Sequence, residues 1–329
     1  MRIAIDAMGG DHAPAINVKG ALLAAKEWHD VEIILVGDTA KIQPYLTESL
    51  PNVRIHHTEE TISSEDEPVK AVRSKKNSSM VVAGRLVKDH EADAMISAGN
   101  TGALMATGLL VIGRIQGVDR PALAPMMPTQ DGVGVLALDM GANMDATAEH
   151  LRQYAIMGSV YRRVMHGIEK PRIGLLNVGI EDTKGNEISK SAFSLLKEAP
   201  VHFVGNVEST DVLLGKCDVL VCDGFVGNIM LKSFEGAAHL IFSALKKEFT
   251  HSIITKLAAS LLKGRLRIIK KQMDYQEYGG APLLGIQGVC IKCHGSSSDE
   301  NVVRLAVRQA RSALANDLVQ SLADEINRK

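Results

Sequence analysis

The sequence has few aromatic residues, few cysteines and almost no net charge. Six Phe, five Tyr and one Trp are too few to build base-stacking platforms or a carbohydrate-binding groove. The 37 basic and 38 acidic residues leave a formal charge of −1, so we expect no nucleic-acid partner. Four cysteines in 329 residues do not suggest a disulfide framework, which favours a cytoplasmic protein with reduced thiols.

Several common motifs are also missing. Asp6 interrupts the apolar N-terminus, so we predict no signal peptide. The sequence has no Walker loop and no G-x-S-x-G elbow, which argues against a nucleoside triphosphate site and a serine hydrolase. The uncharged run 94–113 has the length of a membrane span, but Gly99, Asn100 and other polar residues at its centre indicate a strand, a loop and a buried helix.

Two patterns resemble cofactor motifs and are better explained by packing. The G-x-G-x-x-A sequence that starts at Gly132 lies within a predicted strand, not at a strand-to-helix turn. The loose spacing of Cys217 and Cys222 from Cys290 and Cys293 favours small buried residues over zinc or haem ligands. We therefore expect no cofactor and no metal.

The order of apolar runs predicts an α/β fold. With 46% apolar residues the chain can bury a large core. Continuous apolar strands separated by helices indicate a mostly parallel sheet with helices on both faces. We predict a single three-layer α/β/α catalytic domain over 1–329, with a mostly parallel mixed sheet. The predicted strands are 3–7, 32–36, 53–57, 94–97, 122–127, 133–138, 173–178, 202–204, 219–222 and 290–293.

Three helical signals are clear. Ser64-x-x-Glu67 followed by Pro68 is typical of a capping box, and Ser298 precedes a long amphipathic helix. Residues 233–273 predict a helical hairpin arm that either packs a dimer or also touches an anionic membrane, and these two interpretations are compatible. Its apolar tip contains Ile253, Ile254, Leu257, Leu261 and Leu262, and its basic flank contains Lys263, Arg265, Arg267, Lys270 and Lys271.

Glycine and small polar residues follow seven of the predicted strands. Ligands of parallel sheets bind at the carboxyl ends of the strands, so this pattern predicts a polar cleft. The loops that begin at Gly99 and Gly295 each follow a strand and open a helix, where free N–H groups favour an anion. The predicted phosphate-binding residues are Ser97, Gly99, Asn100, Thr101, Gly102, Gly295, Ser296 and Ser297.

Eight motifs resemble those of the bacterial acyl-ACP:phosphate acyltransferase (PlsX) family. The resemblance runs in order from residue 1 to about residue 315, without large insertions. Cys290 and Cys293 are not part of the family pattern. The motifs are 6–12 (DAMGGDH), 66–73 (DEPVKAVR), 77–80 (NSSM), 96–103 (ISAGNTGA), 176–179 (LNVG), 184–187 (KGNE), 223–225 (DGF) and 294–297 (HGSS).

The resemblance implies the fold of phosphotransacetylases and isocitrate/isopropylmalate dehydrogenases, and a homodimer. It implies an enzyme that makes acyl phosphate from acyl-acyl carrier protein (acyl-ACP) and inorganic phosphate. This step feeds bacterial phospholipid synthesis, because a membrane glycerol-3-phosphate acyltransferase uses the product. Members of the family associate peripherally with the membrane.

The proposed chemistry is direct attack of phosphate on the thioester carbonyl, since a thiol with a pKa near ~8.5 leaves readily. Among the predicted catalytic residues, Lys184 supplies positive charge and Asn228 donates to the carbonyl oxygen. His294 and His12 handle a proton or contact phosphate. The residues expected to support the cleft are Asp6, Gly9, Gly10, Asp11, Asn143, Asn177 and Asp223.

A short basic segment predicts where an acidic carrier protein docks, with a solvated face as the alternative. It contains Lys70, Arg73, Lys75 and Lys76. Three other functions stay open from the sequence: a coenzyme A-dependent phosphotransacetylase of similar fold, a decarboxylating dehydrogenase of similar fold and a non-catalytic membrane-docking scaffold. The dehydrogenase is disfavoured because no cluster of metal-binding carboxylates is evident.

Overall fold

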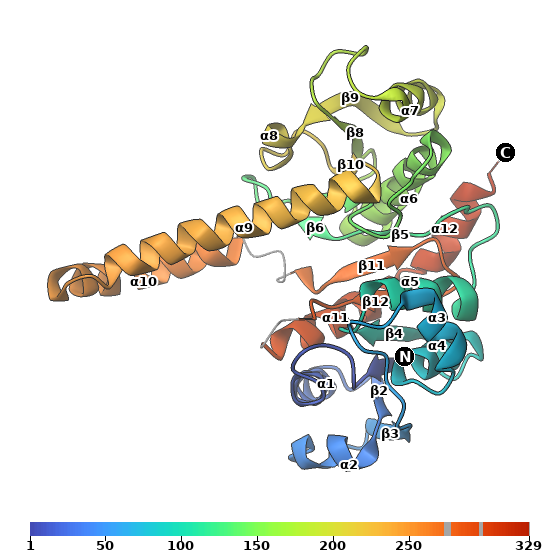
Figure 1. The fold of residues 1–329 in the computed structure, drawn as a ribbon, viewed down its shortest axis with the longest axis vertical. Helices are drawn as coiled ribbons and strands as arrows, with labels where there is room; N and C mark the ends of the chain where they lie inside the picture. The colour runs from blue at the N-terminus through green and yellow to red at the C-terminus, as the bar shows by residue number, and fades with distance from the viewer. Residues whose placement is uncertain (273–277, 296–298, 329) are drawn as a thin grey trace.

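The computed structural model describes residues 1–272, 278–295 and 299–328, and its strands form two sheets (Figure 1). The first sheet has seven strands in the order β3-β2-β1-β4-β12-β11-β5. The pairs from β3 to β12 are parallel, and β11 is antiparallel to both of its neighbours. Its strands are β1 (Arg2–Asp6), β2 (Glu32–Gly37), β3 (Val53–His57), β4 (Ala94–Ser97), β5 (Ala122–Leu123), β11 (Ala281–Leu284) and β12 (Val289–Lys292).

The second sheet has five strands in the order β6-β7-β10-β8-β9. All of its pairs are parallel except β6 with β7. Its strands are β6 (Met126–Met127), β7 (Val135–Leu138), β8 (Arg172–Asn177), β9 (His202–Glu208) and β10 (Val219–Val221).

Helices cover both faces of each sheet, which gives three layers. On the first sheet, α1 (Ala15–Glu27) and α11 (Asn301–Ala315) pack on one face, and α3 (Pro68–Ser74), α4 (Ser79–Lys88) and α5 (Thr101–Thr107) on the other. On the second sheet, α6 (Ala148–His166) and α7 (Glu187–Glu198) lie opposite α8 (Ser209–Val212) and α9 (Gly224–Phe249). The remaining helical segments are α2 (Thr39–Ile42), η1 (Gln43–Tyr45), the π-helical η2 (Gly108–Ile112), α10 (Ile253–Gln272) and α12 (Leu318–Ile326).

The predicted three-layer, mostly parallel architecture is confirmed, but the strands form two sheets where one was predicted, and two further details change. The strand predicted over 122–127 is two strands, β5 in the first sheet and β6 in the second, and the chain crosses between the sheets at Ala124 and Pro125. Proline lacks the N–H that would continue a strand ladder, which explains the break. In addition, β11, a strand that contains Pro282, was not predicted from the sequence.

One helix start and one helix length differ from the sequence prediction. Helix α3 begins at Pro68 after Glu67, with no side-chain cap, so the capping box predicted from Ser64 is wrong while proline at the first turn is confirmed. The long C-terminal helix is two helices, α11 and α12, separated at Asn316 and Asp317. The predicted cap Ser298 lies outside the described residues.

The predicted hairpin is present, and it begins earlier than expected. Helices α9 and α10 form an arm that projects from the body of the molecule (Figure 1). Several apolar side chains on the arm are exposed, among them Ile254 (79%) and Leu261 (88%). In the described part of the chain, no helix is long and apolar enough to cross a membrane. The run 94–113 is β4, a loop, α5 and η2, as predicted.

Candidate active site

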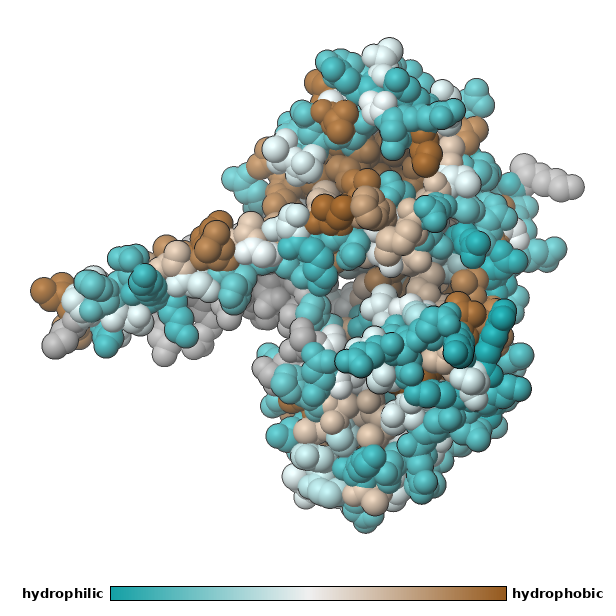
Figure 2. Space-filling model, viewed as in Figure 1, coloured by the Kyte–Doolittle hydropathy of each residue, from teal (hydrophilic) through white to brown (hydrophobic). Residues whose placement is uncertain are grey.

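A cavity of about 750 Å³ lies at the carboxyl ends of β4 and β12, between the two sheets. Figure 2 shows the hollow between the two halves of the body. Loops from the first sheet form one wall, and residues after β5 and β7 together with α9 form the other. Ligands of parallel sheets bind in this position, so the cavity is the candidate active site.

The loop after β1 and the loop after β4 are held together by a buried carboxylate. Asp6 accepts hydrogen bonds from the hydroxyls of Ser79 (2.6 Å) and Ser97 (2.7 Å), and Ser97 in turn accepts one from the amide of Gly99 (3.0 Å). Burial raises the pKa of Asp6, and the two hydroxyl donors oppose that shift. Asp6 and Ser97 are fully buried, so they position the loops and do not line the cavity.

Three glycine loops converge at the polar end of the cavity. The amide of Asp11 donates to the carbonyl oxygen of Gly295 at 2.9 Å. A Cβ atom added to Gly295 would stand 2.7 Å from the carbonyl oxygen of Ala98, and one added to Gly9 would stand 2.7 Å from the amide nitrogen of Gly99. Only glycine fits at these close approaches, which explains the glycines that the sequence places at these strand ends.

Asn100 is a structural anchor as well as a cavity-lining residue. Its side-chain oxygen caps α5 by accepting from the amide of Ala103 at 3.1 Å. Its side-chain nitrogen donates to the carbonyl oxygens of Ser63, Ser64 and Asp66, each at 3.2 Å. The loop 61–64 is thereby fixed along the cavity, which it also lines.

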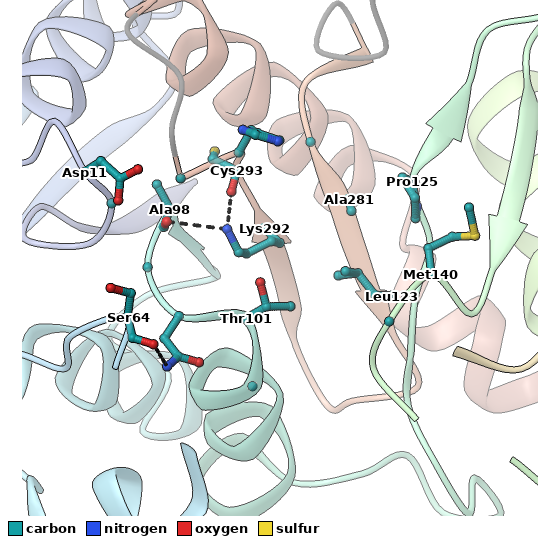
Figure 3. A pocket seen from close by; sticks show the side chains of 18 of the residues that line it. Asp11, Ser64, Ala98, Thr101, Leu123, Pro125, Met140, Ala281, Lys292 and Cys293 are labelled. Carbon is teal, nitrogen blue, oxygen red and sulfur yellow. Dashed lines mark hydrogen bonds between the residues drawn. The ribbon is translucent and has the colours of Figure 1, made fainter. Parts of the chain in front are cut away.

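A buried lysine projects into the polar end, as Figure 3 shows. Lys292, at the end of β12, is 9% exposed, and its ammonium donates to the carbonyl oxygens of Ala98 (3.4 Å) and Cys293. His294, which also lines the cavity, is partly buried, and that burial lowers the pKa of its imidazole. His294 Nε2 lies 4.0 Å from Glu235 Oε1. A neutral imidazole can both donate and accept a proton.

Helix α9 supplies further polar side chains. Asn228, Lys232 and Glu235 line the cavity from this helix, and Lys232 pairs with Glu235 at 2.8 Å. Asp223 caps α9 through its carboxylate, which accepts from the amides of Phe225 (3.0 Å) and Val226 (2.9 Å). Asp223 therefore fixes the start of the helix that presents Asn228.

The opposite end of the cavity is apolar. Leu123, Pro125, Met140 and Ala281 lie together on that side (Figure 3), and Leu231 of α9 also lines the cavity. The site therefore joins a glycine-rich polar pocket to an apolar one. This arrangement suits a substrate that has a charged or polar reacting group and an apolar tail.

Other predicted residues lie outside the lining of this cavity. Lys184 is exposed on the loop after β8, 4.0 Å from Glu181, and its carbonyl oxygen accepts from Asn177 at 3.1 Å. Asn143 donates to Asp139 (3.0 Å) and to the carbonyl oxygen of Pro121 (2.7 Å). Asp139 also accepts three backbone amides, yet burial raises its pKa to about 6.

His12 is exposed beside a second, nearly filled hollow that Gly9, Gly10 and His294 also line. Ser296 and Ser297 lie outside the described residues. Of the other predicted residues, Gly10, Asp11, Gly99, Asn100, Thr101, Gly102, Asn228, His294 and Gly295 line the main cavity.

The four cysteines are buried and unbridged. Cys290 and Cys293 pack in different core clusters, on opposite faces of the first sheet. Within the described ranges, no group of three His, Cys, Asp or Glu side chains is placed to hold a metal ion.

Sequence reasoning missed the loop 61–64, Lys232, Glu235 and Lys292. For Lys292 a signal existed, because a charged residue in an otherwise apolar strand directly before a glycine loop is expensive to bury without a function. Lys232 and Glu235 are polar residues on an amphipathic helix, and the sequence does not distinguish them from its solvated face.

The sequence profile of the family described as "Fatty acid synthesis protein" matches residues 1–321. The chain is 57% identical over 328 residues to the phosphate acyltransferase of Geobacillus thermodenitrificans, covering 100% of this chain and 99% of the relative. It is 55% identical over 329 residues to the phosphate acyltransferase of Bacillus cereus strain B4264, with the same coverage.

Solved structures show the same fold at low sequence identity. A phosphotransacetylase from Streptococcus pyogenes matches with a TM-score of 0.64 at 18% identity, covering 96% of this chain and 94% of that one. A branched-chain phosphotransacylase from Enterococcus faecalis matches with a TM-score of 0.55 at 17% identity, covering 95% and 99%. The predicted likeness to the phosphotransacetylase fold is therefore confirmed.

Proposed function

The chain belongs to the fatty acid synthesis protein (PlsX) family of phosphate acyltransferases, and from this premise we propose that it converts acyl-ACP and inorganic phosphate into acyl phosphate. The observation that supports this substrate pair is the two-ended cavity. Its polar end suits a phosphate beside the thioester, and its apolar end suits the acyl chain, next to Leu123, Pro125 and Met140.

In the proposed reaction a phosphate oxygen attacks the thioester carbonyl carbon. A C–O bond forms, the C–S bond breaks and the carrier-protein thiolate leaves with the bonding electron pair. The thiolate becomes the thiol by taking up the proton that the attacking hydrogen phosphate gives up. Asn228 donates a hydrogen bond to the carbonyl oxygen as it gains charge, a contribution of ~3 kcal/mol for one such donor. In this proposal His294, whose pKa is lowered by burial, passes that proton to the leaving sulfur.

Lys184 remains a predicted source of positive charge for this reaction, although it lies outside the cavity lining. The test is single-turnover formation of acyl phosphate by a Lys184→Ala variant. A rate near that of the wild type would remove Lys184 from the mechanism.

The carrier protein docks, in this proposal, on α3. This short helix follows the cavity-lining loop 61–64 and packs on α5. Lys70 and Arg73 on α3 and Lys76 just after it are exposed, whereas Lys75 is held by Asp66 at 2.6 Å and contributes less to steering. Exposed cations attract an acidic partner over a distance of about 8–10 Å at moderate salt.

The arm serves two contacts in this proposal. The exposed apolar side chains of α9, among them Leu240 and Ile241, pack against a second copy of the chain. The tip, with Ile254, Leu257, Leu261 and Leu262 exposed, touches an anionic membrane from the cytoplasmic side. The side chains of Ile253 and of the basic residues 263, 267, 270 and 271 lie outside the described part. Membrane contact would bring acyl phosphate to a membrane glycerol-3-phosphate acyltransferase for phospholipid synthesis.

Incubation with palmitoyl-ACP and phosphate, with direct detection of palmitoyl phosphate, tests the function. We expect formation that depends on both substrates and is much faster than with palmitoyl-CoA. Faster turnover of palmitoyl-CoA would identify a coenzyme A-dependent enzyme. Membrane binding without thioester cleavage would identify a docking scaffold.

A further inference from the structure

Lys292 stands in a row of three polar residues across neighbouring strands. Asp6 of β1 and Lys292 of β12 are both register partners of Ser97 in β4. Register partners on adjacent strands project from the same face of a sheet, so the three side chains share one face. The hydroxyl of Ser97 donates a hydrogen bond to the carboxylate of Asp6, and Lys292 is the third residue of the row, at the wall of the cavity.

The ammonium of Lys292 has an incomplete set of partners. A lysine ammonium has three N–H donors. Among the described residues, Lys292 donates to two backbone carbonyl oxygens, those of Ala98 and Cys293, and it forms no ion pair with a carboxylate. Asp6 and Asp11 attract the ammonium only across a distance, so an anion bound in the cavity would supply the direct ion pair that this buried charge lacks.

The other lysines near the site differ in this respect. Lys232 also lines the cavity, but Glu235 neutralises it at 2.8 Å. Lys184 lies on an exposed loop outside the lining. Lys292 is a buried cation beside the converging loops of Gly10, Gly99 and Gly295, and these residues line the same cavity as Lys292.

We propose that Lys292 binds the phosphate substrate, with its ammonium ion-paired to a phosphate oxygen at the meeting point of the three glycine loops. This inference deepens the proposed function and rests on it. Asp6 and Ser97 act as positioning residues in the proposal, because they fix the loop that carries Gly99 and stand beside Lys292 without touching the ligand.

The test compares Lys292→Gln, which keeps donors for the two carbonyl oxygens but removes the charge, with Lys292→Arg, which keeps a charge. We expect Lys292→Gln to raise the KM for phosphate at least tenfold while the KM for palmitoyl-ACP changes less than twofold. Lys292→Arg should raise the KM for phosphate less than Lys292→Gln does. A purely structural lysine would move both KM values, or kcat alone.

A second readout needs no acyl donor. Inorganic phosphate should raise the unfolding midpoint of the wild type and of Lys170→Met, a variant of an exposed lysine that lies before β8, and it should not raise that of Lys292→Gln. In phosphate-free buffer the midpoint of Lys292→Gln should not fall, because the variant removes a buried unpaired charge. Should Lys292→Gln fail to fold, the comparison of Lys292→Arg with the wild type in both phosphate readouts decides the question.

An unchanged phosphate KM, or an unchanged phosphate-induced shift of the midpoint, in folded Lys292→Gln would overturn the proposal. Loss of the phosphate-induced shift in Lys170→Met as well would show a general effect of lost charge and would also overturn the proposal. A wild-type protein whose midpoint responds to phosphate but which makes no acyl phosphate would refute the proposed function and leave the phosphate site standing.

Discussion

The amide of Asp11 donates to the carbonyl oxygen of Gly295 at 2.9 Å, and this bond joins the loop after the first strand to the loop after the last. The two strands, β1 and β12, are both neighbours of β4 in the sheet, which brings their carboxyl ends together. The polar end of the cavity is thus built by residues from the two ends of the chain, and it depends on correct pairing of the whole first sheet.

The close packing of these loops predicts the effect of a single methyl group. A Gly295→Ala variant places a Cβ atom 2.7 Å from the carbonyl oxygen of Ala98, so the loops must separate. We expect the KM for phosphate to rise about tenfold or more, measured by steady-state formation of acyl phosphate. The control is Gly236→Ala on α9, where a Cβ atom meets nothing within 4 Å. Equal effects of the two variants would contradict this account of the loops.

The buried carboxylate of Asp6 predicts a large effect on stability. Asp6→Ala leaves the hydroxyls of Ser79 and Ser97 without their acceptor in a buried place, which should cost about 2–4 kcal/mol of unfolding free energy. Asp6→Asn should cost less, since one acceptor oxygen remains. Urea unfolding measures both. As a control, Asp30→Ala removes an exposed pair with Arg311 and should cost under about 1 kcal/mol; a similar loss in both alanine variants would refute the role given to Asp6.

The basic face of α3 predicts salt-dependent kinetics. A Lys70→Glu, Arg73→Glu double variant should raise the KM for palmitoyl-ACP several-fold at low salt and less at high salt, with an unchanged KM for phosphate. Lys170→Glu is the matched control, because this exposed lysine precedes β8 of the second sheet, whereas α3 packs on the first sheet. An effect that is independent of salt, or shared by the control, would reject docking on α3.

The exposed tip of the arm predicts membrane binding. A Leu257→Gln, Leu261→Gln double variant removes apolar contact that a bilayer would bury, at about 25 cal/mol per Å². We expect co-sedimentation with phosphatidylglycerol-containing vesicles to fall at least tenfold, while the oligomeric state measured by sedimentation stays unchanged. Ser260→Gln on the same helix is the control. Undiminished vesicle binding of the double variant would place the membrane contact elsewhere.

Local patterns in the sequence predicted most strands and the arm, but not how the strands divide between sheets. The run 122–127 reads as one apolar strand, and only long-range pairing sends Ala122–Leu123 to the first sheet and Met126–Met127 to the second. The segment Ala281–Leu284 was missed because proline usually argues against a strand. In the structure this segment is β11, which pairs antiparallel with β12 on one side and with β5, the edge strand of the first sheet, on the other.

The site was predicted where the chemistry is local and missed where it depends on burial. The glycine loops were found because they follow strands, and Asn100 and Gly295 do line the cavity. The sequence could not reveal that the Ser97 hydroxyl is committed to Asp6, or that Lys292 is buried beside it. Those facts depend on register between strands that are distant in sequence. The loop position of Lys184, outside the lining, likewise depends on the tertiary fold.

In the proposed reaction, bound phosphate itself attacks the thioester, and no acyl-enzyme intermediate forms. The most direct measurement mixes stoichiometric enzyme with radiolabelled palmitoyl-ACP, first without phosphate and then with it. The account predicts no burst of free thiol and no labelled protein before phosphate is added, followed by one palmitoyl phosphate for each thiol released. A stoichiometric burst of thiol with label retained on the protein, in the absence of phosphate, would contradict it.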